Sequence, residues 1–120
     1  MTPLKYVRLE QEGETLIVSP LFTFGRFTEG DLVHEWDQVL RRIDGPEVKH
    51  VVVDLGQIPY FGSTLLEWMV QMWKRAKEKG ASLAACNPSH IGREVLAIAH
   101  FNDLWGIYSS RGEALKSFKD

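Results

Sequence analysis

The sequence predicts an α/β domain with a mixed, mostly parallel β-sheet, an N-terminal antiparallel hairpin and about four helices. Three observations lead to this prediction. Residues 50–55 form a nearly continuous β-branched run, which is typical of a strand buried on both faces. Strand-like and helix-like segments alternate after that run, which implies right-handed crossovers between parallel strands. Near the N-terminus, two short strand-like segments are separated by only four residues, as in a hairpin.

The hairpin and the first helix come before the central strand. Residues 5–10 and 15–19 are the expected strands, and Gly13 supplies the turn between them. A helix is expected to begin at Thr28, because apolar residues then recur at helical spacing until Gly45-Pro46 ends the pattern. The recurring apolar positions are Leu32, Val33, Trp36, Val39, Leu40 and Ile43.

The elements after residue 55 follow in a regular order. A long amphipathic helix comes first, and two further strands alternate with two further helices. Their expected ranges are a helix over about 64–79 that ends at Gly80, a strand over 81–86, a helix over about 90–99, a strand over 104–108 and a last helix opened by a capping box of Ser110 and Glu113.

Composition limits the classes of function. The 120 residues suffice for one domain over 1–120, and 44% apolar with 25% charged residues is typical of a globular protein. A net charge of −2 gives no reason to expect nucleic acid as the partner. The single cysteine, Cys86, fits a reducing compartment. Neither a signal peptide nor a membrane-inserted segment is recognised, so we expect a cytoplasmic location.

The junction between the central strand and the long helix is the most informative site. A short loop after Asp54 delivers two hydroxyls, Ser63 and Thr64, to the helix start. A hydroxyl there can cap the helix, or it can carry a phosphate that the free N–H groups and the helix dipole stabilise. The order Thr64-Leu65-Leu66-Glu67 is itself a capping box. With Thr64 as the cap, Ser63 lies just outside the helix and is available for phosphorylation.

Other chemistries are less well supported by the residues. Asp54 ends a buried strand as a receiver aspartate does, but the acidic pair and the lysine that a receiver needs are missing, so we expect Asp54 to bind loop amides. The histidines lack metal-ligand spacing, and Cys86 in its apolar strand is expected to be a core residue. Neither a nucleotide-binding loop nor an acid–base pair is visible, so we expect no metal, no cofactor and no enzyme activity.

Three motifs together resemble one known family, over roughly residues 5–118. Val51 to Leu66 gives a hydrophobic strand ending in Asp-Leu, a short loop and a serine before a helix. Lys79 to Pro88 gives a helix end, a glycine, a strand and an Asn-Pro turn. The third motif lies between Val95 and Leu115. In order and spacing these motifs resemble the STAS domain, the family of bacterial anti-sigma-factor antagonists.

The resemblance implies a protein-binding switch. In the family, a partner that is both a serine kinase and an anti-sigma factor phosphorylates the first serine of the loop, and the unphosphorylated antagonist binds that partner. Position by position, the resemblance implies that the phosphate acceptor here is Ser63. Whether the protein forms a homodimer is left open. The residues expected to contact the partner are Thr23, Phe24, Tyr60, Phe61, Gly62, Ser63, Thr64 and Glu67.

The sequence departs from the family pattern around the acceptor. Gly62 replaces the acid that usually precedes the serine, and Leu65 replaces the usual glycine. A second family acid is replaced by Thr23. The site has therefore lost negative charge and gained apolar bulk. Two alternatives stay open: a STAS scaffold or accessory subunit of a transporter or sensory complex that is not phosphorylated, and a small catalytic or ligand-binding domain. Trp68 lies off the main apolar stripe of its helix and is a candidate for an exposed interface anchor.

Overall fold

The computed structural model describes residues 4–21, 29–59 and 61–118, without the side chains of 29–32 and 102. Its five strands form one sheet in the order β1-β2-β3-β4-β5. β1 pairs with β2 antiparallel, and the other neighbours are parallel, so the predicted mixed sheet with an N-terminal hairpin is confirmed. The strands are β1 (Val7–Glu12), β2 (Thr15–Pro20), β3 (His50–Asp54), β4 (Ser82–Cys86) and β5 (Gly106–Tyr108).

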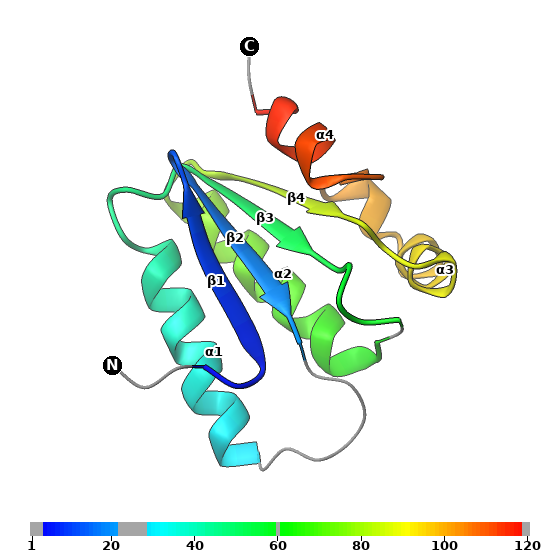
Figure 1. Ribbon diagram of the computed structural model, residues 1–120, viewed down its shortest axis with the longest axis horizontal. Helices are drawn as coiled ribbons and strands as arrows, with labels where there is room; N and C mark the ends of the chain where they lie inside the picture. Colours follow the sequence, from blue (N-terminus) through cyan, green and yellow to red (C-terminus); the bar gives the residue numbers. More distant parts are fainter. Residues whose placement is uncertain (1–3, 22–28, 60, 119–120) are drawn as a thin grey trace.

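Helices cover both faces of this sheet. α1 and α2 lie behind the sheet in Figure 1, whereas α4 lies on the face toward the viewer. The predicted start of α1 at Thr28 lies outside the described residues. The last strand begins at Gly106 rather than at the predicted residue 104, because Leu104 keeps a helical backbone conformation at the end of the 3₁₀ turn over 101–103. The helices are α1 (Glu29–Ile43), α2 (Ser63–Glu78), α3 (His90–Ile98), the 3₁₀ turn η1 (Phe101–Asp103) and α4 (Arg111–Lys116).

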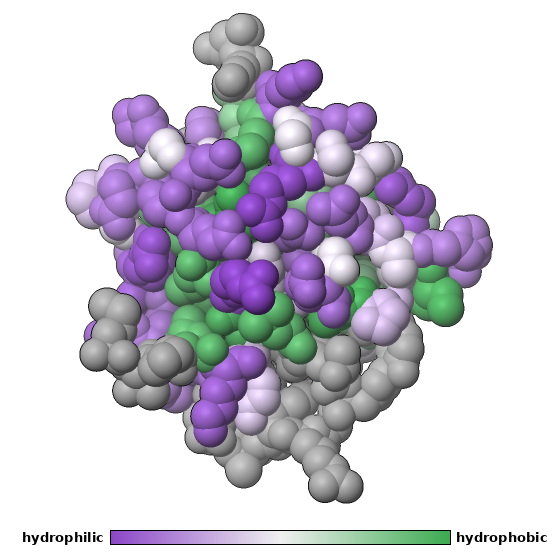
Figure 2. All heavy atoms as spheres, in the orientation of Figure 1, coloured by the Kyte–Doolittle hydropathy of each residue, from purple (hydrophilic) through white to green (hydrophobic). Residues whose placement is uncertain are grey.

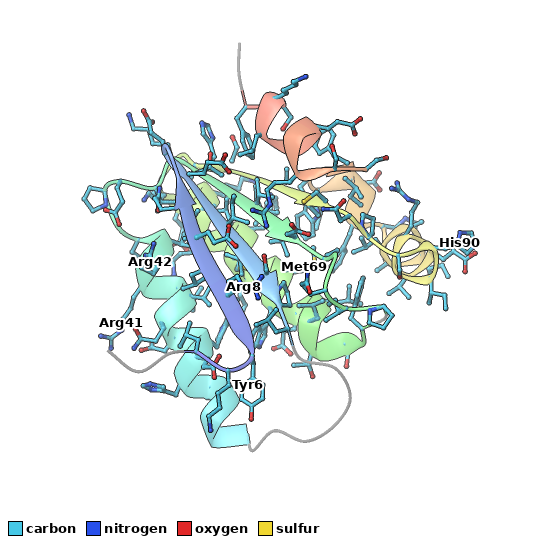
Figure 3. The ribbon with its side chains drawn as sticks, viewed as in Figure 1. Tyr6, Arg8, Arg41, Arg42, Met69 and His90 are labelled. Carbon is cyan, nitrogen blue, oxygen red and sulfur yellow. The ribbon has the colours of Figure 1, made fainter. Side chains whose placement is uncertain are left out.

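The sheet separates two apolar clusters of unequal size. The smaller one lies under α4, where Ala114 packs among strand residues of the same face. The larger one lies between the sheet and α1 with α2, and Figure 3 shows Met69 of α2 in that layer. Hydrophilic side chains predominate on the face that carries α4 (Figure 2). The buried members of the smaller cluster are Ile17, Val52, Ala84, Cys86 and Ala114, which confirms that Cys86 is a core residue.

The contact between α1 and α2 corrects one prediction. Trp68 is not an exposed anchor: it is 7% exposed and stacks on Trp36 with ring centroids 4.4 Å apart. The indole N–H of Trp36 also donates to Oε1 of Gln71 at 2.9 Å. Because α1 packs against this side of α2, the helix buries a wider face than its main apolar stripe indicates.

A buried carboxylate fixes the start of the hairpin to α1. Glu35 is 5% exposed, and its two carboxylate oxygens accept hydrogen bonds from the backbone N–H groups of Lys5 at 2.8 Å and Tyr6 at 2.7 Å. Hydrogen bonds to a charged acceptor are stronger than neutral ones. Glu35 therefore ties the N-terminal edge of the sheet to the helix layer behind it.

Candidate functional site

Ser63 is the first residue of α2, a helix of 16 residues. Both Ser63 and Thr64 are exposed, whereas Leu65 beside them is fully buried and anchors the first turn in the core. Among the described residues, the Ser63 hydroxyl has no hydrogen-bond partner. The hydroxyl therefore lies at the positive end of the helix dipole and is free to be modified or contacted.

Gly62, rather than Thr64, is the N-cap of α2. The backbone of Gly62 is extended, and its carbonyl accepts a hydrogen bond from the N–H of Leu66 at 3.3 Å. The predicted capping box of Thr64 and Glu67 is wrong, because the helix begins at Ser63, which was expected just outside it, and Thr64 lies inside its first turn. A glycine cap has no side chain with which to satisfy the first N–H groups of the helix. No side chain of the described residues caps these donors, so they can bind an anion.

The loop between β3 and α2, residues 55–62, is fixed to α3 at two points. The hydroxyl of Ser89, the N-cap of α3, donates to the carbonyl of Pro59 and accepts from the N–H of Gly92 at 2.9 Å. The Phe61 ring packs against Gly92 so closely that a Cβ added there would lie 2.9 Å from Cε1 of Phe61. The first turn of α3 thus helps to set the approach to Ser63.

The same loop is held at its beginning by Asp54. Oδ1 of Asp54 accepts from the N–H of Gly56 at 2.9 Å and from the side-chain amide of Asn87 at 3.1 Å. The prediction that Asp54 binds loop amides is confirmed. Asn87 reaches this position from a left-handed backbone conformation, with φ of 55°, directly after β4.

Arg111 of α4 completes the network on the other oxygen. Its Nε and Nη2 atoms donate to Oδ2 of Asp54 at 3.1 and 3.0 Å, and its Nη1 atom donates to Glu10 of β1 at 2.9 Å. Ser110 caps α4 as predicted by accepting from the N–H of Glu113, which fixes Arg111 at the first helical position. Residues from β1, β3 and α4 therefore meet on the face of the sheet that carries α4.

The hydrogen-bond network shifts the pKa values of Asp54 and Arg111. Burial alone would raise the pKa of Asp54, but hydrogen bonds from Gly56, Asn87 and Arg111 outweigh it and hold that pKa below its ordinary value of 3.8. Burial alone would lower the pKa of Arg111, but its pairing with Asp54 and Glu10 raises it. Burial raises the pKa of the neighbouring Cys86 thiol to about 12, and the Asp54 charge adds to this. Cys86 is therefore an unreactive thiol at neutral pH.

The structure brings together only part of the predicted partner surface. Phe61, Gly62, Ser63, Thr64 and Glu67 gather around the start of α2, and all of them except the half-buried Phe61 are exposed. The remaining predicted contacts, Thr23, Phe24 and Tyr60, lie outside the described residues.

Sequence reasoning missed Arg111, Gly92 and Glu10 as parts of this site. Arg111 and Asp54 are 57 residues apart in the chain, and Arg111 and Glu10 are 101 apart, so no local pattern pairs them. The described residues contain no group of three or more His, Cys, Asp or Glu side chains arranged to hold a metal ion. Within the same residues, no helix is long and apolar enough to cross a membrane.

A family model matches most of this chain and identifies its family. The model of the STAS domain matches residues 33–114, which is more than half of the chain. The chain belongs to the STAS domain family. This STAS domain also resembles an anti-sigma-factor antagonist domain protein from Planctomyces limnophilus, with 30% identity, a TM-score of 0.78, and coverage of 95% of this chain and 98% of that one.

Two solved structures of lower identity share the fold. A putative anti-sigma factor antagonist from Thermotoga maritima is 15% identical, with a TM-score of 0.79 and coverage of 95% of both chains. The phosphorylated form of the Bacillus cell fate determinant SpoIIAA is also 15% identical, with a TM-score of 0.69 and coverage of 94% of this chain and 99% of that one. Comparison with curated protein sequences gave no match.

Proposed function

We propose that this STAS domain is a cytoplasmic, non-enzymatic antagonist of an anti-sigma factor. Its partner is an anti-sigma factor with serine kinase activity, which docks on the surface around the start of α2. Phosphorylation of Ser63 by that partner ends the complex. The observation that carries the proposal is Ser63 itself, an exposed hydroxyl without a hydrogen-bond partner among the described residues, at the N-terminus of a long helix in a STAS domain.

The local geometry suits a phosphate. A phosphoserine carries about −1.5 to −2 charges at neutral pH. With glycine as the N-cap and no acidic residue in the first turn, the first N–H groups of α2 are free to stabilise that charge. The nearest acid along α2 is Glu67, which is exposed and therefore solvated, so its repulsion is weak.

The same geometry suits dissociation on phosphorylation. The surface next to Ser63 contains the apolar Phe61, and Gly62 stands in place of the usual loop acid, so a partner that covers this surface excludes water from the hydroxyl. Burying a doubly charged phosphate under such a partner carries a large desolvation penalty. The phosphate is therefore accepted by the free protein and rejected by the complex.

A pull-down from the native cell tests this proposal. Wild type and Ser82→Asp should retain an ATP-binding anti-sigma factor, whereas Ser63→Asp should lose it. Ser82 is an exposed serine at the opposite end of the sheet, so it controls for added charge. Retention of the same partner by Ser63→Asp would contradict the switch.

A scaffold without phosphorylation is the second candidate, as in an accessory subunit of a transporter or a sensory complex. Gly62, in place of the acid that usually precedes the acceptor, favours it. In that case Ser63→Ala and Ser63→Asp should both leave the complex intact, and Phe61→Ala should weaken it. Recovery of transporter components in the pull-down would support this candidate.

A further inference from the structure

We propose that Arg111 is a positioning residue for the β3–α2 loop, so that the C-terminal helix α4 sets the presentation of Ser63. The part of this inference that concerns partner binding rests on the proposed function above. The part that concerns the loop rests only on the contacts of the described residues.

The path from α4 to the loop has two steps. Arg111 donates two hydrogen bonds to Oδ2 of Asp54, and Oδ1 of the same carboxylate accepts from the N–H of Gly56. Two N–H groups of the planar guanidinium converge on Oδ2, and together with the Asn87 amide on Oδ1 they fix the orientation of the carboxylate. Oδ1 is thereby aimed at Gly56, the second residue of the loop.

Asp54 is buried, so the loss of its ion pair with Arg111 should have a measurable effect on the loop. The Asp54 side chain is 10% exposed, so a missing partner would not be replaced freely by water. Glu10, the second carboxylate that pairs with Arg111, has a side chain that is 39% exposed and belongs to the edge strand β1. We therefore expect Asp54 to depend on Arg111 more than Glu10 does.

The other supports of the loop do not involve Arg111, and Asn87 is one of them because its amide binds Oδ1 of Asp54. Leu55 donates its N–H to the carbonyl of Cys86 at 2.9 Å, Ile58 is buried, and Pro59 accepts from Ser89. These contacts keep the loop folded without Arg111. The effect of Arg111 should therefore be a local loosening of the loop rather than global unfolding.

Amide hydrogen exchange of the whole protein, followed residue by residue, tests the positioning. Arg111→Met should raise exchange at Gly56 and Ile58 by about tenfold or more, as expected for the loss of a charge-assisted bond to a buried group. The central strand residues Val51–Val53 should change far less. Arg41→Met is the matched control, since Arg41 pairs with Asp37 on the exposed side of α1. Glu10→Gln should also leave Gly56 protected.

Two outcomes would overturn the proposal. Unchanged exchange at Gly56 in Arg111→Met would show that α4 does not hold the loop. A uniform rise across the sheet would show that Arg111 only stabilises the fold. Arg111→Lys separates charge from geometry: it keeps the charge but loses the paired N–H groups, so it should restore only part of the protection.

Partner binding is measured separately with the anti-sigma factor recovered by the wild type. Arg111→Met should weaken that binding by several-fold, and Arg41→Met should not. A loosened loop with unchanged affinity would refute the role of Arg111 in partner binding. Failure of the wild type to bind any anti-sigma factor would instead refute the proposed function, and the exchange result would still decide the positioning.

Discussion

Two glycine-to-alanine substitutions test how the β3–α2 loop is packed against α3. Gly92 and Gly112 both lie in the first turn of a helix. At Gly92 a new Cβ would lie 2.9 Å from Cε1 of Phe61 and 3.1 Å from the hydroxyl oxygen of Ser89. At Gly112 the nearest atom would be the hydroxyl oxygen of Ser110 at 3.9 Å, an ordinary contact. The same chemical change should therefore have opposite effects on stability.

The magnitudes follow from packing and helix propensity. Replacing glycine by alanine in a helix stabilises it by up to about 1 kcal/mol. Gly112→Ala should raise the free energy of unfolding by roughly 0.5–1 kcal/mol, because the new methyl group meets no close neighbour. In Gly92→Ala the same gain in the free energy of unfolding should be opposed by a loss of about 1–3 kcal/mol, because the new methyl group is overpacked against Phe61. The two variants should therefore differ by about 1–3 kcal/mol in their free energy of unfolding, with Gly92→Ala the less stable.

Urea denaturation monitored by tryptophan fluorescence measures this difference. With a urea m-value of about 1–3 kcal/mol/M, the two midpoints should separate by about 1 M. Phe61→Leu should relieve the clash, so the loss in Gly92→Ala should shrink when the two substitutions are combined. Equal stabilisation by both alanines would refute the packing of Phe61 on Gly92.

Two further predictions concern buried carboxylates. The folded-state pKa of Asp54 is lowered, so its contribution to stability is present above an unfolded pKa of about 4 and is lost as pH falls through the lower folded value. The stability advantage of wild type over Asp54→Asn in denaturant titrations should therefore shrink steadily below about pH 4, and a constant difference would contradict the network. Glu35→Gln should cost about 1–3 kcal/mol and expose the Lys5 and Tyr6 amides to exchange, because a carboxamide offers only one acceptor oxygen for two N–H groups. Glu94→Gln on the exposed side of α3 should stay within about 0.5 kcal/mol of wild type, and an equal loss in both would refute the role of Glu35.

The elements that could be predicted are those with local signals. The buried run of residues 50–55 predicted β3, and Ser110 predicted the cap of α4, because a cap needs only its own first turn. The two hydroxyls Ser63 and Thr64 were predicted near the start of α2, but Ser63 is its first residue and does not lie just outside it. Thr64 was wrongly predicted as the cap because two adjacent hydroxyls fit the same pattern, and the extended backbone of Gly62 decided the position.

The rest of the site depends on contacts between distant parts of the chain. Arg111 looked like an ordinary capping-box residue, and its pairing with Asp54 exists only after α4 has packed on the sheet. Gly92 carried no sequence signal, because the ring it accommodates comes from another loop. Trp68 was misjudged since the position of α1 relative to α2 decides which side of α2 is covered.

Phosphopeptide mapping directly tests whether the kinase partner phosphorylates Ser63. The purified protein is incubated with the kinase recovered by its pull-down and with ATP, and the modified residue is located by mass spectrometry. We expect a single phosphate on Ser63 and none on the Ser63→Ala variant. A bound kinase that leaves Ser63 unmodified, or that modifies another residue instead, would contradict it.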